Sequence, residues 1–432
     1  MASQPWSELV EPRLSGAAPS AQNRAVGSAY VWRTMDSLRL WTCFTLLATA
    51  TLSIWCRSEW VLRCAQAGMM TMVAVEPRLP AGTRGRFSLL LLAAAAVVGL
   101  AQLGLGRTAS ASATVEECLY WVTLAAMYCL LAPLEASRRH LSNALLATGV
   151  FSLLLCAAGT LQFFTSEGQI FWNWPSGEPG VFGPFHSRNN YASFALLAFP
   201  IAAWLGIEKA RINWGWLSGA ALIAASVFTS GSRAGSALML IELPVFLLLV
   251  RPRTKGRFLL VAAGLVVLVG GFLVSTGWDL LANKLLDDDP LRFRREIIGS
   301  AISMAKDKPL GGHGLGSFSS VYPAYARFDS GHLVNHAHND WAEWVAEGGF
   351  PYAVLLLMLA LVTLRGIPEA PWSLGLAAVY MHALIDYPMQ RLGLAGWVIF
   401  IAALQSTAIA APWARSSTRL PDLGPAESSR MP

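Results

Sequence analysis

Residues 87–105 read FSLLLLAAAAVVGLAQLGL, nineteen residues without a charged side chain. About 20 helical residues cross the hydrocarbon core of a bilayer, so this run predicts a membrane-spanning helix. Similar runs recur along the 432 residues, of which 54% are hydrophobic and only 13% charged. Soluble domains carry roughly 25% charged residues. The sequence therefore argues against a soluble protein and predicts an all-α, polytopic membrane protein with about twelve transmembrane helices.

The predicted helices divide the chain into five parts. The segment 59–75 is the weakest span, because it contains Arg63 and Gln66. The expected order is a tail (1–36), nine spans (37–276), a long loop (277–341), three spans (342–412) and a second tail (413–432). The predicted spans are 38–56, 59–75, 87–105, 114–134, 141–164, 190–207, 214–229, 235–250, 258–276, 343–364, 371–385 and 392–411.

Basic residues predict the orientation of these spans. Nineteen of the 32 Lys and Arg residues fall in the tails and the loops on one side, and six fall in the short loops opposite. Short cytoplasmic loops are enriched in Lys and Arg, so both termini are predicted to be cytoplasmic. The basic residues form no single stripe, and the net charge of +6 therefore does not indicate nucleic acid. Chemistry is expected on the opposite, outer face.

Two arginines lie at outer ends of predicted spans. Arg188 follows Gly183-Pro184-Phe185, and Arg233 lies in the short segment Ser230-Gly231-Ser232-Arg233-Ala234-Gly235. An arginine in such a place can extend its side chain to the membrane interface. It can also bind an anion at a helix N-terminus, where free N–H groups favour negative charge. Both interpretations stay open on these residues alone, although small neighbours favour a ligand at Arg233.

The long outer loop is expected to contain an amphipathic helix. Asp289 and Pro290 are typical of a helix start, and the helix is predicted to run to about Asp307. Arg294 lies near its beginning, where a basic residue opposes the helix dipole and can serve an outside anion or lipid phosphates. The glycine-rich segment 311–316 fits neither a dinucleotide fingerprint nor a P-loop, so it predicts only a tight turn.

Histidines follow this helix in the sequence. His336 and His338 are two residues apart and do not share a helix face, which argues against a zinc site. A single histidine suits proton transfer, because its pKa lies near neutral pH; a hydrogen-bonded loop histidine is the alternative. Later, His382 and Asp386 stand four apart, a spacing that brings side chains together on one helix face. They are expected to orient a catalytic group or to satisfy each other.

In this order, these segments resemble the O-antigen ligase and polymerase superfamily of bacterial envelope glycosyltransferases. The resemblance covers roughly residues 180–400 and rests on the segments 183–190, 230–235, 294–318 and 338–349, with His382 and Asp386. It implies a GT-C-like membrane fold of the bacterial inner membrane that is active on its periplasmic face. The implied reaction moves a glycan from undecaprenyl diphosphate onto an acceptor hydroxyl, with no metal and no cofactor.

The resemblance also implies roles for single residues. Arg233 and His338 match the family motifs best, as diphosphate ligand and general base. Arg188 and Asn190 are expected to bind substrate, with Asn190 fitting the pattern more closely. The remaining substrate-binding candidates are Arg294, His336, His382 and Asp386.

Two questions stay open from the sequence. A ligase passes the glycan to lipid A–core, whereas a polymerase passes it to another lipid-linked glycan, and residues that bind the shared donor do not distinguish them. The loop pattern leans slightly towards a polymerase. A transporter or flippase for a lipid-linked or anionic solute is the alternative class. No internal repeat supports it, and the polar residues gather on one face instead of following a path.

Overall fold

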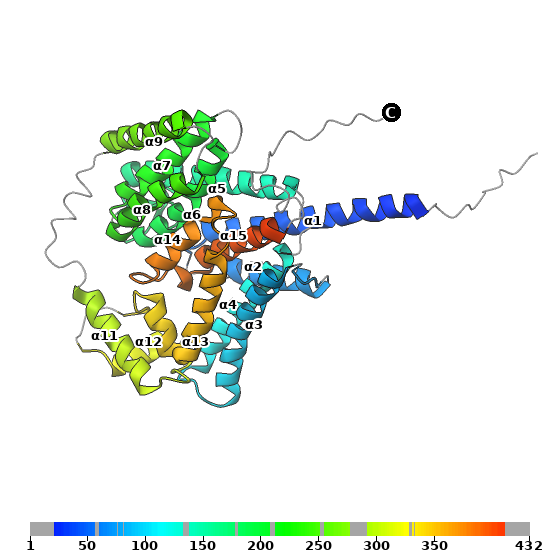
Figure 1. Cartoon of the computed structure of the whole chain (residues 1–432). Helices are drawn as coiled ribbons and strands as arrows, with labels where there is room; N and C mark the ends of the chain where they lie inside the picture. The colour runs from blue at the N-terminus through cyan, green and yellow to red at the C-terminus, as the bar shows by residue number, and fades with distance from the viewer. Residues whose placement is uncertain are drawn as a thin grey trace, which may run out of the picture.

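The computed structural model describes residues 21–56, 60–75, 77–80, 82–132, 138–177, 180–207, 212–250, 255–276, 292–327, 331 and 333–410. Helices dominate these residues (Figure 1). The helices of the first part are α1 (Ala21–Leu52), α2 (Trp60–Val75), α3 (Thr83–Gly104), α4 (Ala111–Leu131), α5 (Arg138–Thr165), α6 (Arg188–Ile207), α7 (Trp214–Thr229), α8 (Arg233–Val250) and α9 (Lys255–Thr276).

The second part begins with the predicted amphipathic helix. The later elements are α11 (Arg292–Asp307), α12 (Phe318–Val321), η1 (Tyr322–Ala324), α13 (Asp340–Leu364), η2 (Pro371–Ser373), α14 (Gly375–His382), η3 (Pro388–Gln390) and α15 (Leu392–Ala410). A short antiparallel hairpin lies between α5 and α6; its strands, β1 (Gln169–Ile170) and β2 (Trp174–Pro175), have two residues each. The predicted helix start at Asp289 and Pro290 lies outside the described residues.

The prediction of an all-α polytopic membrane protein is confirmed. Among the described residues, eight helices are long and apolar enough to cross a membrane. The count of twelve is not confirmed, because α2 and α7 have only 16 residues each. The helix α1 also begins at Ala21, well before the expected span at 38–56.

The prediction of one regular helix over 371–385 was wrong. Here the chain forms the short 3₁₀ helix η2 and then α14, which has only eight residues. Pro388 has no N–H to continue the helical pattern. The carbonyl groups of residues 383–386 accept hydrogen bonds from Asn339 and Asp340 at the start of α13 and from Arg294 of α11. Local hydrophobicity does not report such distant partners.

The predicted span 343–364 lies in α13, which is two helices instead of one. Gly349 has φ 78°, a left-handed conformation that separates a first segment (340–348) from a longer apolar segment (350–364). The N–H of Phe350 donates to the carbonyl of Pro309 at 2.8 Å, so the segment that follows α11 packs against α13 at this break.

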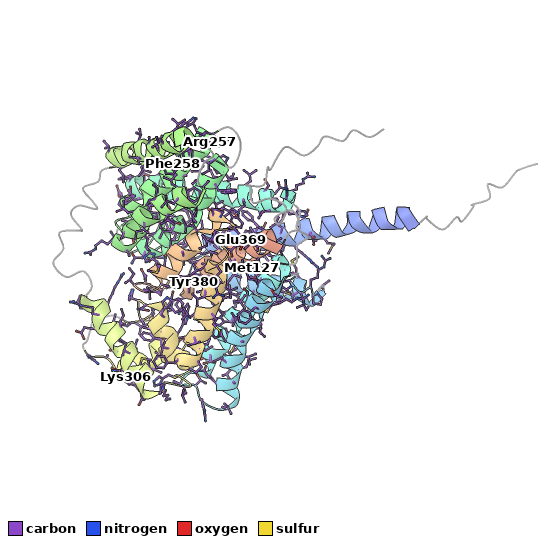
Figure 2. The ribbon with its side chains drawn as sticks, in the orientation of Figure 1. Met127, Arg257, Phe258, Lys306, Glu369 and Tyr380 are labelled. Carbon is purple, nitrogen blue, oxygen red and sulfur yellow. The ribbon has the colours of Figure 1, made fainter. Side chains whose placement is uncertain are left out.

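Chain direction gathers the polar termini at one end of the bundle, which we call the site end. The helices α6, α8, α13 and α15 begin there, and α14 ends there. The helices α6 and α15 are largely buried, whereas α9 is mostly exposed. Figure 2 shows Tyr380 of α14 in the middle of the molecule and Lys306 of α11 towards its edge. The two most buried helices, α6 and α15, therefore both begin at the site end.

Candidate active site

A hydrogen bond joins the first residues of α6 and α8. The hydroxyl of Ser232 donates to Oδ1 of Asn189 at 2.7 Å. The two helices also touch where Gly235 faces Ala192, since a Cβ at Gly235 would lie 2.6 Å from the Ala192 Cβ. Arg188 and Arg233 are the first residues of these two helices, so both predicted arginines lie at adjoining helix N-termini.

These two N-termini make the site end electropositive. The free N–H groups of a helix start carry roughly half a positive charge, to which each arginine adds a full one. Both arginine side chains are partly exposed. The side chain of Asn190 is buried beside them, and its Oδ1 has no hydrogen-bond partner among the described residues. This arrangement is suited to a multiply charged anion.

One turn further along α6, Ser193 links the arginines to His382. The hydroxyl of Ser193 donates to the carbonyl of Asn189 at 3.1 Å and lies 2.8 Å from Nδ1 of His382. A hydroxyl has a single proton to donate, so Nδ1 of His382 is the donor in the second bond. The ring is fully buried, and His382 therefore positions neighbouring groups instead of facing the exterior.

His382 and Asp386 lie close together, as their spacing predicts: the N–H of Asp386 donates to the carbonyl of His382 at 3.0 Å, and His382 is one of the groups that lower the pKa of Asp386. The helix α14 ends at His382, and the chain then turns. The N–H of Asp340 contacts the carbonyls of Ala383 and Asp386, at 2.9 and 3.2 Å, and Arg294 donates to that of Ile385 at 2.9 Å. This turn also brings the Asp386 carboxylate next to His338 and Arg294.

Asp386 is the centre of the second half of the site. Its side chain is only 1% exposed, and its two oxygens lie 3.5 Å from Nδ1 of His338 and 3.8 Å from Nη2 of Arg294. The N–H of Tyr387 donates to it at 3.0 Å. Burial raises the pKa of Asp386, but His338 and the positive charge of Arg294 outweigh burial, and the pKa lies below its usual value. The group is therefore held as an anion.

The two loop histidines have separate carboxylate partners. His338 has φ 52°, which is rare for a residue with a side chain, and 33% of its side chain is exposed. His336 contacts Glu343 instead, with 2.9 Å between Nδ1 and Oε1. Local strain of this kind persists only where surrounding contacts hold it, and here it places His338 over Asp386.

Tyr387 connects the two histidines and is a residue that the sequence analysis missed. Its ring stacks on His336, with 4.6 Å between the ring centres, and makes a T-shaped contact with His338, with 4.9 Å between the centres. The guanidinium of Arg391 lies 5.5 Å from the centre of the same ring. The signal available in the sequence was its position directly after Asp386. Asn189, Ser193, Ser232 and Glu343 were also missed as contact residues, although each adjoins a predicted motif.

The glycine-rich segment is a structural connector and not a phosphate cradle. Its N–H groups are already used: those of His313 and Gly314 donate to carbonyls of α13, and that of Leu315 donates to Gln102. Gly312 has φ 62° and packs against the carbonyl of Glu347 so closely that no Cβ would fit. The expectation of a tight turn is confirmed.

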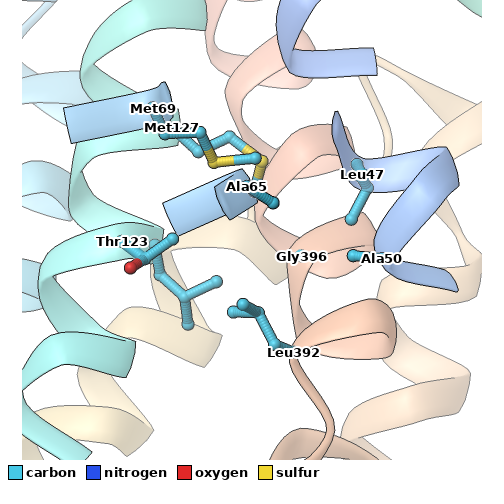
Figure 3. A pocket seen from close by; sticks show the side chains of 9 residues that line it. Leu47, Ala50, Ala65, Met69, Thr123, Met127, Leu392 and Gly396 are labelled. Atoms are coloured by element: carbon cyan, nitrogen blue, oxygen red, sulfur yellow. The ribbon is translucent and has the colours of Figure 1, made fainter. Parts of the chain in front are cut away.

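A small apolar pocket lies elsewhere, between α1, α2, α4 and α15 (Figure 3). The hydroxyl of Thr123 in its wall donates to the carbonyl of Leu119 at 2.7 Å and is not available to a ligand. No charged side chain lines this pocket, so it does not suit a phosphate or a sugar. Its lining residues are Leu47, Ala50, Ala65, Met69, Thr123, Leu124, Met127, Leu392 and Gly396.

The predicted site residues are thus brought together from distant parts of the chain. Arg188, Asn190 and Arg233 form one group, and Arg294, His336, His338 and Asp386 form another; His382 and Ser193 connect them. No described group of His, Cys, Asp and Glu side chains is arranged to hold a metal ion. Fold and site together define a multi-pass α-helical membrane protein with a basic, histidine-containing polar centre at one end.

Comparison with known families agrees with this class. Residues 218–357, about one third of the chain, match the family model described as O-antigen ligase. This match confirms the predicted relationship to the O-antigen ligase and polymerase superfamily, and it supports an enzyme of the glycosyltransferase type. The matched segment contains Arg233, Arg294, His336 and His338 and ends before His382. No curated protein matches the chain.

Proposed function

We propose that the protein is an inner-membrane glycosyltransferase of the O-antigen ligase or polymerase type, active on the periplasmic face. Its donor would be a glycan on undecaprenyl diphosphate, and its acceptor a hydroxyl of lipid A–core or of another lipid-linked glycan. The observation that carries the proposal is the hydrogen bond from Ser232 to Asn189, because it sets Arg188 and Arg233 at adjoining helix N-termini. A diphosphate is the lipid headgroup that best fits two arginines and two helix dipoles.

The proposed reaction is a single inverting displacement. The acceptor oxygen bonds to the anomeric carbon while the bond from that carbon to the diphosphate oxygen breaks. His338 takes the hydroxyl proton at Nε2, since its Nδ1 faces Asp386. The diphosphate leaves with the electron pair, and Arg188 and Arg233 neutralise its charge without a metal ion. We assign a positioning role to Asp386 and His382, because both side chains are buried, and to Arg294, because it contacts Asp386.

Substitution in a purified, lipid-reconstituted protein tests these roles. His338→Ala should lower kcat by roughly 10²–10⁴, the usual contribution of a general base. Arg233→Ala should lower it by roughly 10²–10³, because charge on the leaving group is no longer offset. Lys306→Ala, on the exposed face of α11, is the control and should leave the rate unchanged. Full activity of His338→Ala would remove the proposed base.

Deletion of the gene tests the function as a whole. The measurement is the length of the glycans that remain on undecaprenyl diphosphate. Long lipid-linked chains with uncapped lipid A–core indicate a ligase, whereas single repeats that never lengthen indicate a polymerase. If neither pool changes, the proposal is wrong, and transport of a lipid-linked solute becomes the next function to test.

A further inference from the structure

His336 is held more firmly than the proposed base, His338. Its Nδ1 lies 2.9 Å from Oε1 of Glu343, whose side chain is 2% exposed. The other oxygen of this carboxylate accepts the N–H of Ala337 at 2.6 Å. Glu343 is therefore fixed by the backbone next to the histidine that it contacts. The corresponding distance from His338 to Asp386 is longer, 3.5 Å.

This geometry fixes the proton positions on the His336 ring. A carboxylate accepts hydrogen bonds and does not donate them, so Nδ1 of His336 carries a proton. The neutral imidazole then presents a lone pair at Nε2. Among the described residues no group hydrogen-bonds to Nε2, and this atom is not among those sealed from solvent. About 22% of the side chain is exposed.

The ring of His336 is also fixed in orientation. One face stacks on Tyr387 with 26° between the ring planes, and Tyr387 in turn lies against Arg391. His338 makes a T-shaped contact with the same tyrosine ring. The two imidazoles are thus neighbours on one aromatic support, and a sugar carries hydroxyl groups on adjacent carbons.

We propose that His336 is a binding residue for the acceptor sugar: its Nε2 accepts a hydrogen bond from a hydroxyl next to the one that reacts. This inference rests on the proposed function and adds a separate role for each histidine. His338 takes the proton of the reacting hydroxyl, and His336 binds the adjacent hydroxyl of the acceptor sugar. The arginines of α6 and α8 serve the donor, so His336 should affect the acceptor alone.

Two substitutions separate the nitrogen atoms of the ring. His336→Asn keeps a donor near the position of Nδ1 for Glu343 and removes Nε2, whereas His336→Gln keeps a polar atom near the position of Nε2. The acceptor used is the one that accumulates in the deletion strain, either lipid A–core or lipid-linked single repeats. With it, His336→Asn should raise the acceptor KM by about 10-fold, because one hydrogen bond contributes roughly 0.5–1.5 kcal/mol. In this variant kcat and the donor KM should stay within about twofold. His336→Gln should stay within about threefold of the original acceptor KM, because an amide partly replaces the lost contact.

Other results overturn the inference without touching the proposed function. Unchanged acceptor KM in both variants would show that His336 does not contact the acceptor. A kcat loss as large as that of His338→Ala, with KM unchanged, would assign proton transfer to His336 instead. Equal losses in both variants with a lowered unfolding temperature would show a structural role. The proposed function itself fails only if the unsubstituted protein transfers no glycan from undecaprenyl diphosphate.

Discussion

His313, in the connector between α11 and α12, shows how one buried side chain couples stability to pH. Its Nε2 lies 3.1 Å from the carbonyl of Met304, and burial lowers its pKa below the usual value. The unfolded chain therefore binds a proton first as the pH falls below about 6.5. Stability should be intact above this pH and should decrease as the pH falls towards the pKa of the folded state.

The prediction is checked by thermal unfolding in detergent between pH 7.5 and pH 5. The unsubstituted protein should lose more of its unfolding temperature over this range than His313→Gln, whose amide also donates to Met304 but does not titrate. Other histidines contribute to both proteins, so the difference isolates His313. Identical pH dependence in the two proteins would contradict the assignment.

Motifs identified the candidate residues, but spacing alone did not reveal all of their contacts. Arg188 and Arg233 stand at helix starts as expected, because small and polar residues precede them. The four-residue spacing of His382 and Asp386 does bring them together, but it did not indicate that the turn after α14 is also held by Asp340 and by Arg294, about 90 residues away. Local spacing carries no information about such partners. The contacts of Tyr387 with both histidines were not predictable for the same reason, although its position beside Asp386 was a signal.

The junction of α6 and α8 depends on a position without a side chain. Gly235→Ala would place a Cβ 2.6 Å from Ala192 and push the two helices apart. Overpacking of this kind costs typically about 1–3 kcal/mol. It should also separate Arg188 from Arg233, so we expect transfer activity to fall about 10-fold or more, together with the unfolding temperature.

Gly270→Ala is the matched control, because no atom lies within 4 Å of the added Cβ in α9. It should leave activity unchanged and unfolding unaffected or slightly improved, since alanine favours helix over glycine. The measurements are initial transfer rates and thermal unfolding of both variants. Equal behaviour of the two variants would show that the α6–α8 contact does not position the arginines.

Periodicity predicted some helices in detail and failed at others. The helix α11 ends at Asp307 as expected and buries Ile297, Ala301 and Met304. The predicted span 343–364 lies within α13, which is long and apolar enough to cross a membrane, but the sequence did not predict the break at Gly349, where the N–H of Phe350 donates to the carbonyl of Pro309. An apolar run indicates that a segment is shielded from water. It does not indicate where a distant segment forms a hydrogen bond to the helix and interrupts it.

Composition was sufficient for the fold class, because a chain with so few charged residues needs lipid to cover its surface. The number of spans was not predictable at the same level. Among the described helices, α2 and α7 have 16 residues each and α14 has eight, fewer than the roughly 20 that a full crossing takes. The GT-C-like architecture stays a prediction.

The distribution of basic residues predicts the orientation of the whole protein. Alkaline phosphatase, which is active only outside the cytoplasm, should be inactive when fused to the C-terminus and active when inserted at Gly177, an exposed position near β2. The reason is the excess of Lys and Arg in loops on the side of the termini. The reverse pattern would place the arginine pair in the cytoplasm and exclude a periplasmic donor.

The shared ring of Tyr387 limits how the proposed acceptor site could be redesigned. Both histidines rest on it, and Arg391 lies against it. A replacement chosen to admit a bulkier sugar at His336 would shift the tyrosine and carry His338 with it. New acceptor preferences are therefore more accessible through exposed residues around the two histidines than through the ring that supports them.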